Sequence, residues 1–290
     1  MLPNPFKRFP RFGMSRERLL HKSMNPYATD NVVGGGPAFV GRTDILQSMM
    51  EQLRCSQQDM IVLYGKRRMG KTSILRELGN RLSDNYQPIY FEGRYALSLK
   101  DILSQFVCEI RSELPFLKPN LGGVEFHNWL SQIISIEADI TRPLVILFDE
   151  TDALQEKTQY ELFNYLHKTL FPTTAHKLKF IFAVGYSDIN EFKSLRELSK
   201  PINSFQVTHL NRQETEILIR SSESVGLHWS KEAVEKVWKL TEGDPRITQH
   251  FCAHIFSEVC NTNIDSVSPK IVEQQWDNFS KNSIPKLLTR

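Results

Sequence analysis

The sequence predicts an α/β fold, in which helices cover both faces of a parallel β-sheet, followed by a smaller helical domain. Three observations lead to this prediction. Short β-rich apolar runs alternate with longer stretches of helical periodicity over the first two thirds of the chain. The run at 144–148 is apolar at every position, which is typical of a central strand covered on both faces. After residue 210 the strand signals stop and only helical patterns follow.

Five apolar runs are the predicted strands, at residues 60–64, 88–92, 144–148, 179–184 and 204–210. Helices are expected between them near residues 71–83, 98–112, 125–139, 154–170 and 188–198. Each helical stretch is polar on one side and long enough to connect two parallel strands by a crossover. The strands and their connections therefore form one α/β domain.

The second part of the chain is predicted to be helical, with helices near residues 212–225, 230–241, 246–260 and 268–282. We therefore expect four regions along the chain. They are a basic flexible arm at 1–24, an α/β core at 25–210, a small helical domain at 211–260 and a C-terminal helical tail at 261–290.

The composition limits the classes of protein to which the chain can belong. With 40% hydrophobic and 24% charged residues it lies near the average of globular proteins, which excludes disordered and fibrous classes. No apolar run approaches the ~20 residues of a membrane span, and the first residues lack the apolar stretch of a signal peptide. The four cysteines do not have the spacing of a zinc or redox site. We expect a cytoplasmic protein with no membrane partner.

The N-terminal arm is the most unevenly charged segment. Lys and Arg exceed Asp and Glu by only 36 to 33 in the whole chain, but residues 1–22 hold a single acid, Glu17, among six basic residues and interleaved phenylalanines. The basic residues are Lys7, Arg8, Arg11, Arg16, Arg18 and Lys22. Such an arm contacts nucleic acid or lipid, or it is a solvated tail. Both interpretations stay open, and DNA is the partner that the arm suggests.

The strongest motif is GKRRMGKT at 65–72, which fits the P-loop pattern G-x-x-x-x-G-K-[ST]. A predicted strand precedes it and a predicted helix follows it, as the motif requires. Its fixed positions would arise by chance in about one chain of this length in a hundred. The loop and first helical turn are therefore predicted to hold nucleotide phosphates, through Gly65, Lys66, Arg67, Arg68, Met69, Gly70, Lys71, Thr72 and Ser73.

Two residues of this motif have distinct predicted roles. The ammonium of Lys71 would reach the β- and γ-phosphates, which makes it a catalytic as well as a binding group. The hydroxyl of Thr72 would ligate Mg²⁺. ATP and Mg²⁺ are thus the expected cofactors.

A second motif, LVILFDETD at 144–152, ends a predicted strand with the adjacent carboxylates Asp149 and Glu150. Ligands of such sheets bind at the carboxyl ends of the strands. Asp149 is therefore predicted to hold the Mg²⁺ shell, and Glu150 to polarise the attacking water as a catalytic group. Taken alone, the pair also fits a solvated acidic turn. Asp152 is expected to be a helix N-cap.

In this combination the chain resembles the AAA+ class of P-loop ATPases, and within it the branch of STAND signalling ATPases and origin-recognition-type helicase loaders. The segment FVGRTDIL at 39–46 is similar to the N-terminal motif of that branch. The resemblance implies a P-loop NTPase sheet of strand order 5-1-4-3-2 and a helical lid, with Mg-ATP bound between them. It also implies that Val40 and Gly41 face the adenine and that Gly41 and Arg42 turn the chain into the first helix.

The resemblance implies further site residues. Ser187, after the fourth strand, lies where the family places a sensor of the γ-phosphate, although a turn hydroxyl fits equally. TEGDPRITQHF at 241–251 is similar to the lid motif, in which Arg246 would be a second sensor. Asp244 as a cap and Pro245 in the first turn of a helix explain that segment as well. Arg196 and Lys200 are the candidates for an arginine-finger role in a neighbouring subunit.

The predicted function is Mg-dependent ATP hydrolysis coupled to conformational switching and to remodelling or recruitment of a protein partner. Two alternatives stay open. One is a nucleotide-gated signalling or scaffold module with slow turnover, and the other is a DNA-associated ATPase of the loader or transposition type. Nucleotide-dependent homo-oligomers are also implied by the resemblance.

Overall fold

A computed structural model gives the structure of the chain. It describes residues 25–27, 34, 39–55, 59–114, 126, 128–130, 142–174, 177–196, 202–260, 262 and 264–289. The chain divides into two compact units, an α/β unit of residues 32–209 and a helical unit of residues 1–31 and 210–290. The basic arm and Lys200 lie outside the described residues. In the part of the chain that the structure describes, no helix has the length and apolar character needed to cross a membrane.

A five-stranded parallel sheet forms the centre of the α/β unit. Its strands are β1 (Met60–Tyr64), β2 (Gln87–Glu92), β3 (Leu144–Asp149), β4 (Leu178–Val184) and β5 (Asn203–Gln206). Their order in the sheet is β2-β3-β4-β1-β5, which confirms the order 5-1-4-3-2. The fifth strand ends four residues earlier than the sequence predicts. Its neighbour β1 ends at Tyr64, where the P-loop begins, so the residues after Val207 have no strand to pair with.

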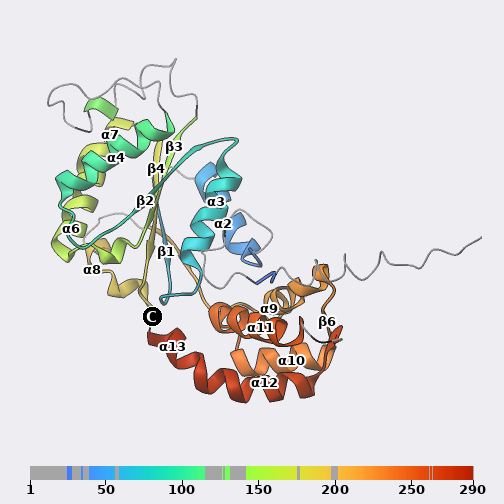
Figure 1. Ribbon diagram of the computed structural model, residues 1–290. Coiled ribbons are helices and arrows are strands. Elements are labelled where there is room, and N and C mark those ends of the chain that lie inside the picture. The colour runs from blue at the N-terminus through green and yellow to red at the C-terminus, as the bar shows by residue number, and fades with distance from the viewer. Residues whose placement is uncertain are drawn as a thin grey trace, which may run out of the picture. The chain divides into compact units, whose positions relative to one another are not determined.

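Helices cover both faces of this sheet (Figure 1). On one face lie α2 (Thr43–Cys55) and α3 (Lys71–Leu82), and on the other α4 (Leu99–Glu113) and α6 (Glu156–Tyr165). A π-helical turn η2 (Leu166–Leu170) and the short α7 (Phe171–Thr174) continue α6. The helix predicted at 125–139 falls mostly outside the described residues.

The prediction of one continuous helix at 188–198 is wrong. Two short pieces take its place, η3 (Ile189–Glu191) and α8 (Lys193–Arg196). Phe192 separates them with a non-helical backbone, and its side chain is fully buried in the core. Burial of this ring therefore overrides the helical pattern.

Side chains along β3 alternate between the two faces of the sheet, and this alternation determines the face on which Asp149 lies. Leu144, Ile146 and Phe148 pack in the core beneath α4 and α6. Val145 and Leu147 pack with α3, which approaches so closely that a Cβ at Gly79 would lie 2.9 Å from Leu147. Since side chains alternate between faces, Asp149 comes out on the α3 face. This is the face on which the P-loop continues into its helix.

The helical unit has its own core. Its helices are α9 (Arg212–Ile219), η4 (Arg220–Val225), α10 (Lys231–Thr241), α11 (Pro245–Cys260), α12 (Pro269–Asn282) and α13 (Ile284–Thr289). Two-residue strands β6 (His228–Trp229) and β7 (Ser266–Val267) pair in parallel. Phe251, Phe256 and Phe279 lie in the centre, so the helices after residue 260 share one core with those before it.

Residues from the N-terminal side of the α/β unit also belong to this helical core. The Tyr27 hydroxyl donates to the Ile219 carbonyl, and its ring packs edge-on against Phe256 with the centroids 6.5 Å apart. The Asn25 side-chain amide donates to the carbonyl of Ala253. The helical unit is therefore discontinuous in sequence.

Candidate functional site

The loop at 65–70 joins β1 to α3, and each of its two motif glycines is required for a different reason. A Cβ at Gly65 would lie 2.3 Å from the Val207 carbonyl oxygen, a distance that no side chain tolerates. Gly70 has φ of +90°, in the left-handed region that glycine adopts at little cost. Arg68 also has a positive φ, of +70°. The loop thus curls back on itself before α3 begins.

The ammonium group of Lys71 lies inside this curl. It donates to the carbonyl oxygens of Gly65 and Lys66, each at 2.8 Å. Burial lowers the pKa of Lys71, while the carboxylates of Asp152, Glu150 and Asp149 act in the opposite direction. A partly desolvated cation held by neutral carbonyls is suited to receive an anion, because a phosphate oxygen would add the charge partner that the carbonyls do not supply.

The start of α3 adds to this preference for anions. The helix begins at Lys71 with Gly70 as its N-cap, and no side chain caps it. The first-turn amides of Lys71, Thr72 and Ser73 cannot bond within the helix, so they are donors for a phosphate. The half-buried side chains of Thr72 and Ser73 stand in this turn.

Asp149 ends β3 with its carboxylate almost fully buried, at 4% exposure. One carboxylate oxygen accepts from the Tyr90 hydroxyl at 2.7 Å and the other from the Glu150 amide at 2.9 Å. A hydroxyl and a carboxylate on one face of the sheet, Thr72 and Asp149, are hard oxygen donors that fit Mg²⁺. Among the described residues no cluster of three His, Cys, Asp or Glu could hold a metal alone, so phosphate and water oxygens would complete the shell.

Glu150 occupies a strained position. Its φ and ψ of 51° and 37° are left-handed, which costs a non-glycine residue about 1 kcal/mol. A Cβ on Gly93 would lie 2.5 Å from the Glu150 carbonyl oxygen, so the loop after β2 packs directly on this turn. Partial burial, followed by the charges of Asp152 and Asp149, raises the pKa of the Glu150 carboxyl. This left-handed turn follows directly on the last residue of β3, Asp149.

The N-cap role predicted for Asp152 is wrong. The residue lies inside the turn η1 (Thr151–Ala153), and its carboxylate accepts from the Gly185 amide at 2.8 Å. The Arg67 guanidinium of the P-loop lies 3.7 Å away. The tight turn brings Asp152 back towards the end of β4, where a Cβ on Gly185 would lie 2.6 Å from it. The sequence offers one sign of a role for Asp152 in the site, which is that a third carboxylate follows Asp149 and Glu150 within three residues.

Arg42 is a second site residue whose contacts the sequence does not reveal. Gly41 and Arg42 both have positive φ, of 74° and 61°, and turn the chain into α2 as the resemblance implies. The Arg42 side chain is only 6% exposed. It donates to the carbonyl of Met69 in the P-loop at 3.2 Å and to that of Thr208 at 2.6 Å. Arg42 thereby joins the P-loop to the segment that follows β5.

The remaining predicted residues are less closely tied to the P-loop. Val40 is half-buried before Gly41, and its contact with adenine stays a prediction. Ser187 is exposed after β4, and its carbonyl accepts from the Gln206 side chain at 3.3 Å. Arg196 ends α8. The sensor role of Ser187 and the finger role of Arg196 stay predictions.

Arg246 lies in the first turn of α11, within the helical unit. Its guanidinium donates to the Leu287 carbonyl of α13 at 2.9 Å. The Asp244 carboxylate accepts from the Ile247 amide at 2.8 Å, and Pro245 is the first helical residue. Asp244 is thus the cap of this helix, and the sensor role of Arg246 stays a prediction.

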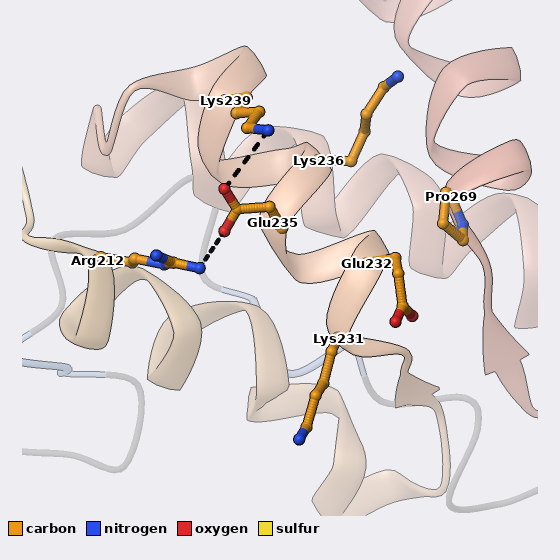
Figure 2. Close-up of a pocket in the computed structure, with 7 residues that line it drawn as sticks. All are labelled: Arg212, Lys231, Glu232, Glu235, Lys236, Lys239 and Pro269. Atoms are coloured by element: carbon orange, nitrogen blue, oxygen red, sulfur yellow. Dashed lines mark hydrogen bonds and ion pairs between the residues drawn. The ribbon is translucent and has the colours of Figure 1, made fainter.

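A hollow of about 460 Å³ lies on the helical unit between α9, α10 and the start of α12 (Figure 2). Its charges are largely paired, since Glu235 contacts both Arg212 and Lys239. Lys236 pairs with Glu273 on α12. A surface whose cations are paired in this way has little preference for an anion, so the P-loop remains the candidate site.

Comparisons with known proteins identify a family and a fold for this chain. Residues 39–250 match a family described as an ATPase domain predominantly from Archaea. No curated protein matches the chain in sequence. The ORC2 protein of Aeropyrum pernix, solved in ADPNP–ADP complexes, shares the fold with a TM-score of 0.61 and 16% identity over 88% of this chain and 71% of its own.

Two further solved structures share the fold at low identity. Cdc6p of Pyrobaculum aerophilum has a TM-score of 0.56 and 13% identity, covering 84% of this chain and 69% of its own. The RuvB Holliday junction branch migration motor of Thermotoga maritima has a TM-score of 0.55 and 14% identity, covering 83% of this chain and 70% of its own.

The family match covers most of the chain and includes the P-loop and the strand-end carboxylates. The sheet order and the flanking helices are those of a P-loop NTPase. The chain therefore belongs to this family of ATPase domains.

Proposed function

We propose that the chain binds Mg-ATP at the P-loop, hydrolyses it and uses the cycle to switch between states that a protein partner distinguishes. The observation that carries the proposal is the Lys71 ammonium, held by the loop carbonyls of Gly65 and Lys66 at the start of an uncapped helix. The carboxylates of Asp149 and Glu150, at the carboxyl end of β3, support hydrolysis in addition to binding.

Each group has a proposed part in the reaction. Lys71 and the first amides of α3 neutralise phosphate charge. Thr72 and Asp149 would hold Mg²⁺, which would neutralise further charge on the phosphate oxygens. Glu150 accepts a proton from the water that attacks the γ-phosphorus, and the bond to the leaving ADP oxygen breaks. The raised pKa of its carboxyl makes Glu150 a better proton acceptor than an ordinary glutamate.

Glu150→Gln tests the hydrolytic role. The amide keeps the shape of the carboxylate but cannot take the proton, so turnover should fall about 100- to 1,000-fold. Binding of a fluorescent ATP analogue should change less than threefold. Glu109→Gln, at an exposed position of α4, is the matched control and should retain full turnover. Phosphate release by Glu150→Gln at the wild-type rate would remove Glu150 from its role.

The same variant can test the switch. If ATP-bound and ADP-bound states differ in affinity for a protein partner, Glu150→Gln with ATP should retain that partner in a pull-down and release it with ADP. Particle size measured by light scattering, with and without ATP, tests whether the nucleotide also drives self-association. A monomer under both conditions would argue against a ring-forming motor.

A DNA-associated role is the second candidate, favoured by the six basic residues of the arm. The relative from Thermotoga maritima, a branch migration motor, is a further reason to test it. Removal of residues 1–22 should weaken binding to duplex DNA and reduce its dependence on salt. An unchanged salt slope would count against the arm. A regulatory module with slow turnover is distinguished by the measured rate of hydrolysis.

A further inference from the structure

Tyr90 lies beside the carboxylate that is proposed to hold Mg²⁺. It belongs to β2, where it pairs with Leu147 in the parallel register, so Asp149 lies two residues further along the same face. The Tyr90 hydroxyl donates to Asp149 Oδ2 at 2.7 Å. This contact joins neighbouring strands at the carboxyl edge of the sheet.

The geometry around Asp149 leaves its carboxylate little freedom to rotate. Tyr90 binds one oxygen, the Glu150 amide binds the other, and the residue is only 4% exposed. Each oxygen has a second lone pair, so both hydrogen bonds can persist when Mg²⁺ or its water binds. A tyrosine hydroxyl can donate one hydrogen bond, and here the Asp149 carboxylate accepts it.

The helix that carries Thr72 also contacts Tyr90. The Arg76 guanidinium, one turn after Thr72 in α3, lies 5.8 Å from the centre of the Tyr90 ring. This distance falls within the range of cation–π attraction. Tyr90 is therefore in contact with both elements that bear the proposed Mg²⁺ ligands, α3 and β3.

We propose that Tyr90 is a positioning residue, whose hydroxyl fixes the orientation of the Asp149 carboxylate for Mg²⁺. The inference rests on the proposed function, and it adds a residue that neither the sequence motifs nor the comparisons assign. Partners of metal-binding carboxylates raise metal affinity by holding the ligand in its bound orientation before the metal arrives. Tyr90 is expected to act on Mg²⁺ and not on the phosphates, which Lys71 and the α3 amides face.

Tyr90→Phe removes one oxygen atom and keeps the ring. The affinity for a fluorescent ATP analogue is measured in EDTA, and then as a function of Mg²⁺ concentration. In EDTA the variant should bind within twofold of wild type. The Mg²⁺ concentration that gives half of the affinity gain should rise about fivefold, as expected for the loss of one hydrogen bond to a ligand. Tyr160→Phe, a tyrosine 44% exposed on α6, is the matched control and should change neither value.

A second pair of variants separates positioning from packing. In an Asp149→Asn background Tyr90→Phe should have no further effect on the Mg²⁺ dependence, because the hydroxyl acts through the carboxylate. An unchanged Mg²⁺ dependence in Tyr90→Phe alone, or a loss of binding in EDTA, would overturn the role of Tyr90 and leave the proposed function standing. Failure of wild type to bind the analogue under any condition would refute both.

Discussion

Two lysines at opposite edges of the same sheet have pKa values lowered by burial, but they differ in their partners. At the amino edge Lys179 lies 3.9 Å from Asp59, and the two side chains are 6% and 8% exposed. At the carboxyl edge Lys71 donates to two neutral carbonyls. Nearby carboxylates that are not hydrogen-bonded to it offset part of the effect of burial on its pKa. The first is a buried ion pair, and the second is a cation whose bonded neighbours carry no charge.

This difference separates a structural cation from a binding one. A carboxylate partner satisfies Lys179 within the fold, so an incoming anion would have to break the pair. The carbonyls around Lys71 accept hydrogen bonds from its ammonium group but do not neutralise its charge. A negatively charged phosphate oxygen can therefore replace them with a favourable change in free energy. Burial and a lowered pKa are common to both lysines and cannot distinguish them.

The largest effect is expected for Lys71→Met. Removal of the ammonium should weaken binding of a fluorescent ATP analogue about 1,000-fold, as is usual when one partner of a close, desolvated charge pair is truncated. The midpoint temperature of thermal unfolding should change little, because only two carbonyls lose a donor and the one of Lys66 is exposed to solvent. A loss of stability without a loss of nucleotide affinity would reverse the distinction between the two lysines.

The converse is expected for Lys179→Met. The change leaves Asp59 buried without this partner and should lower the free energy of unfolding by roughly 3 kcal/mol in a denaturant titration. ATP affinity should stay within twofold of wild type. The double variant Asp59→Leu, Lys179→Met should recover much of the stability, since an apolar pair replaces the buried charges. A nucleotide-binding defect in the folded single variant would contradict a purely structural role.

An intermediate case is Arg42, which like Lys71 donates to carbonyls but is expected to be structural. The guanidinium of Arg42 donates from Nη2 to the carbonyls of Met69 and Thr208 and from Nη1 to that of His209. Arg42→Lys replaces this fork by a single ammonium, which cannot make all three contacts. The free energy of unfolding should fall by about 2 kcal/mol. Arg54→Lys, at an exposed position of α2, is the control. Equal stability of both variants would mean that these carbonyl contacts contribute little.

The smallest effect concerns pH. Because the pKa of Lys179 is lowered in the folded protein, the unfolded chain binds more protons between that lowered pKa and the ordinary value of 10.5. The contribution of Lys179 to the free energy of unfolding should therefore rise as pH increases from the lowered pKa to the ordinary one. The difference in unfolding free energy between wild type and Lys179→Met, measured from pH 7 to 10, should widen as pH rises. A difference that narrows would show that the ion pair outweighs burial.

The sequence predicts those features that depend on neighbouring residues. The strands β1 and β3 are recognised because each is a compact apolar run, and the P-loop because its glycines and lysine have a fixed spacing. The motifs likewise identify Asp149 and Glu150, which directly follow such a run. The strand order is not contained in these local signals and is predicted only by the family resemblance that the motifs carry.

The parts that could not be predicted depend on distant contacts. Tyr90 meets Asp149 across 59 residues of sequence, Asp152 meets Gly185 across 33, and Arg42 meets Thr208 across 166. A single sequence carries no sign of these pairs, because each residue alone fits an ordinary local role. For Asp152 that local role was a helix cap, and the contact with Gly185 overruled it.

The discontinuity of the helical unit has a consequence for dividing the protein into fragments. Residues 1–31 and 210–290 form one unit, so the chain passes between the units twice and a single proteolytic cut at either passage leaves them covalently joined. A fragment with the limits of the family match, 39–250, would lose Tyr27, most of α11 and all of α12, and with them much of the helical core. Truncations intended to isolate the ATPase should therefore begin before Asn25 and extend beyond Phe279.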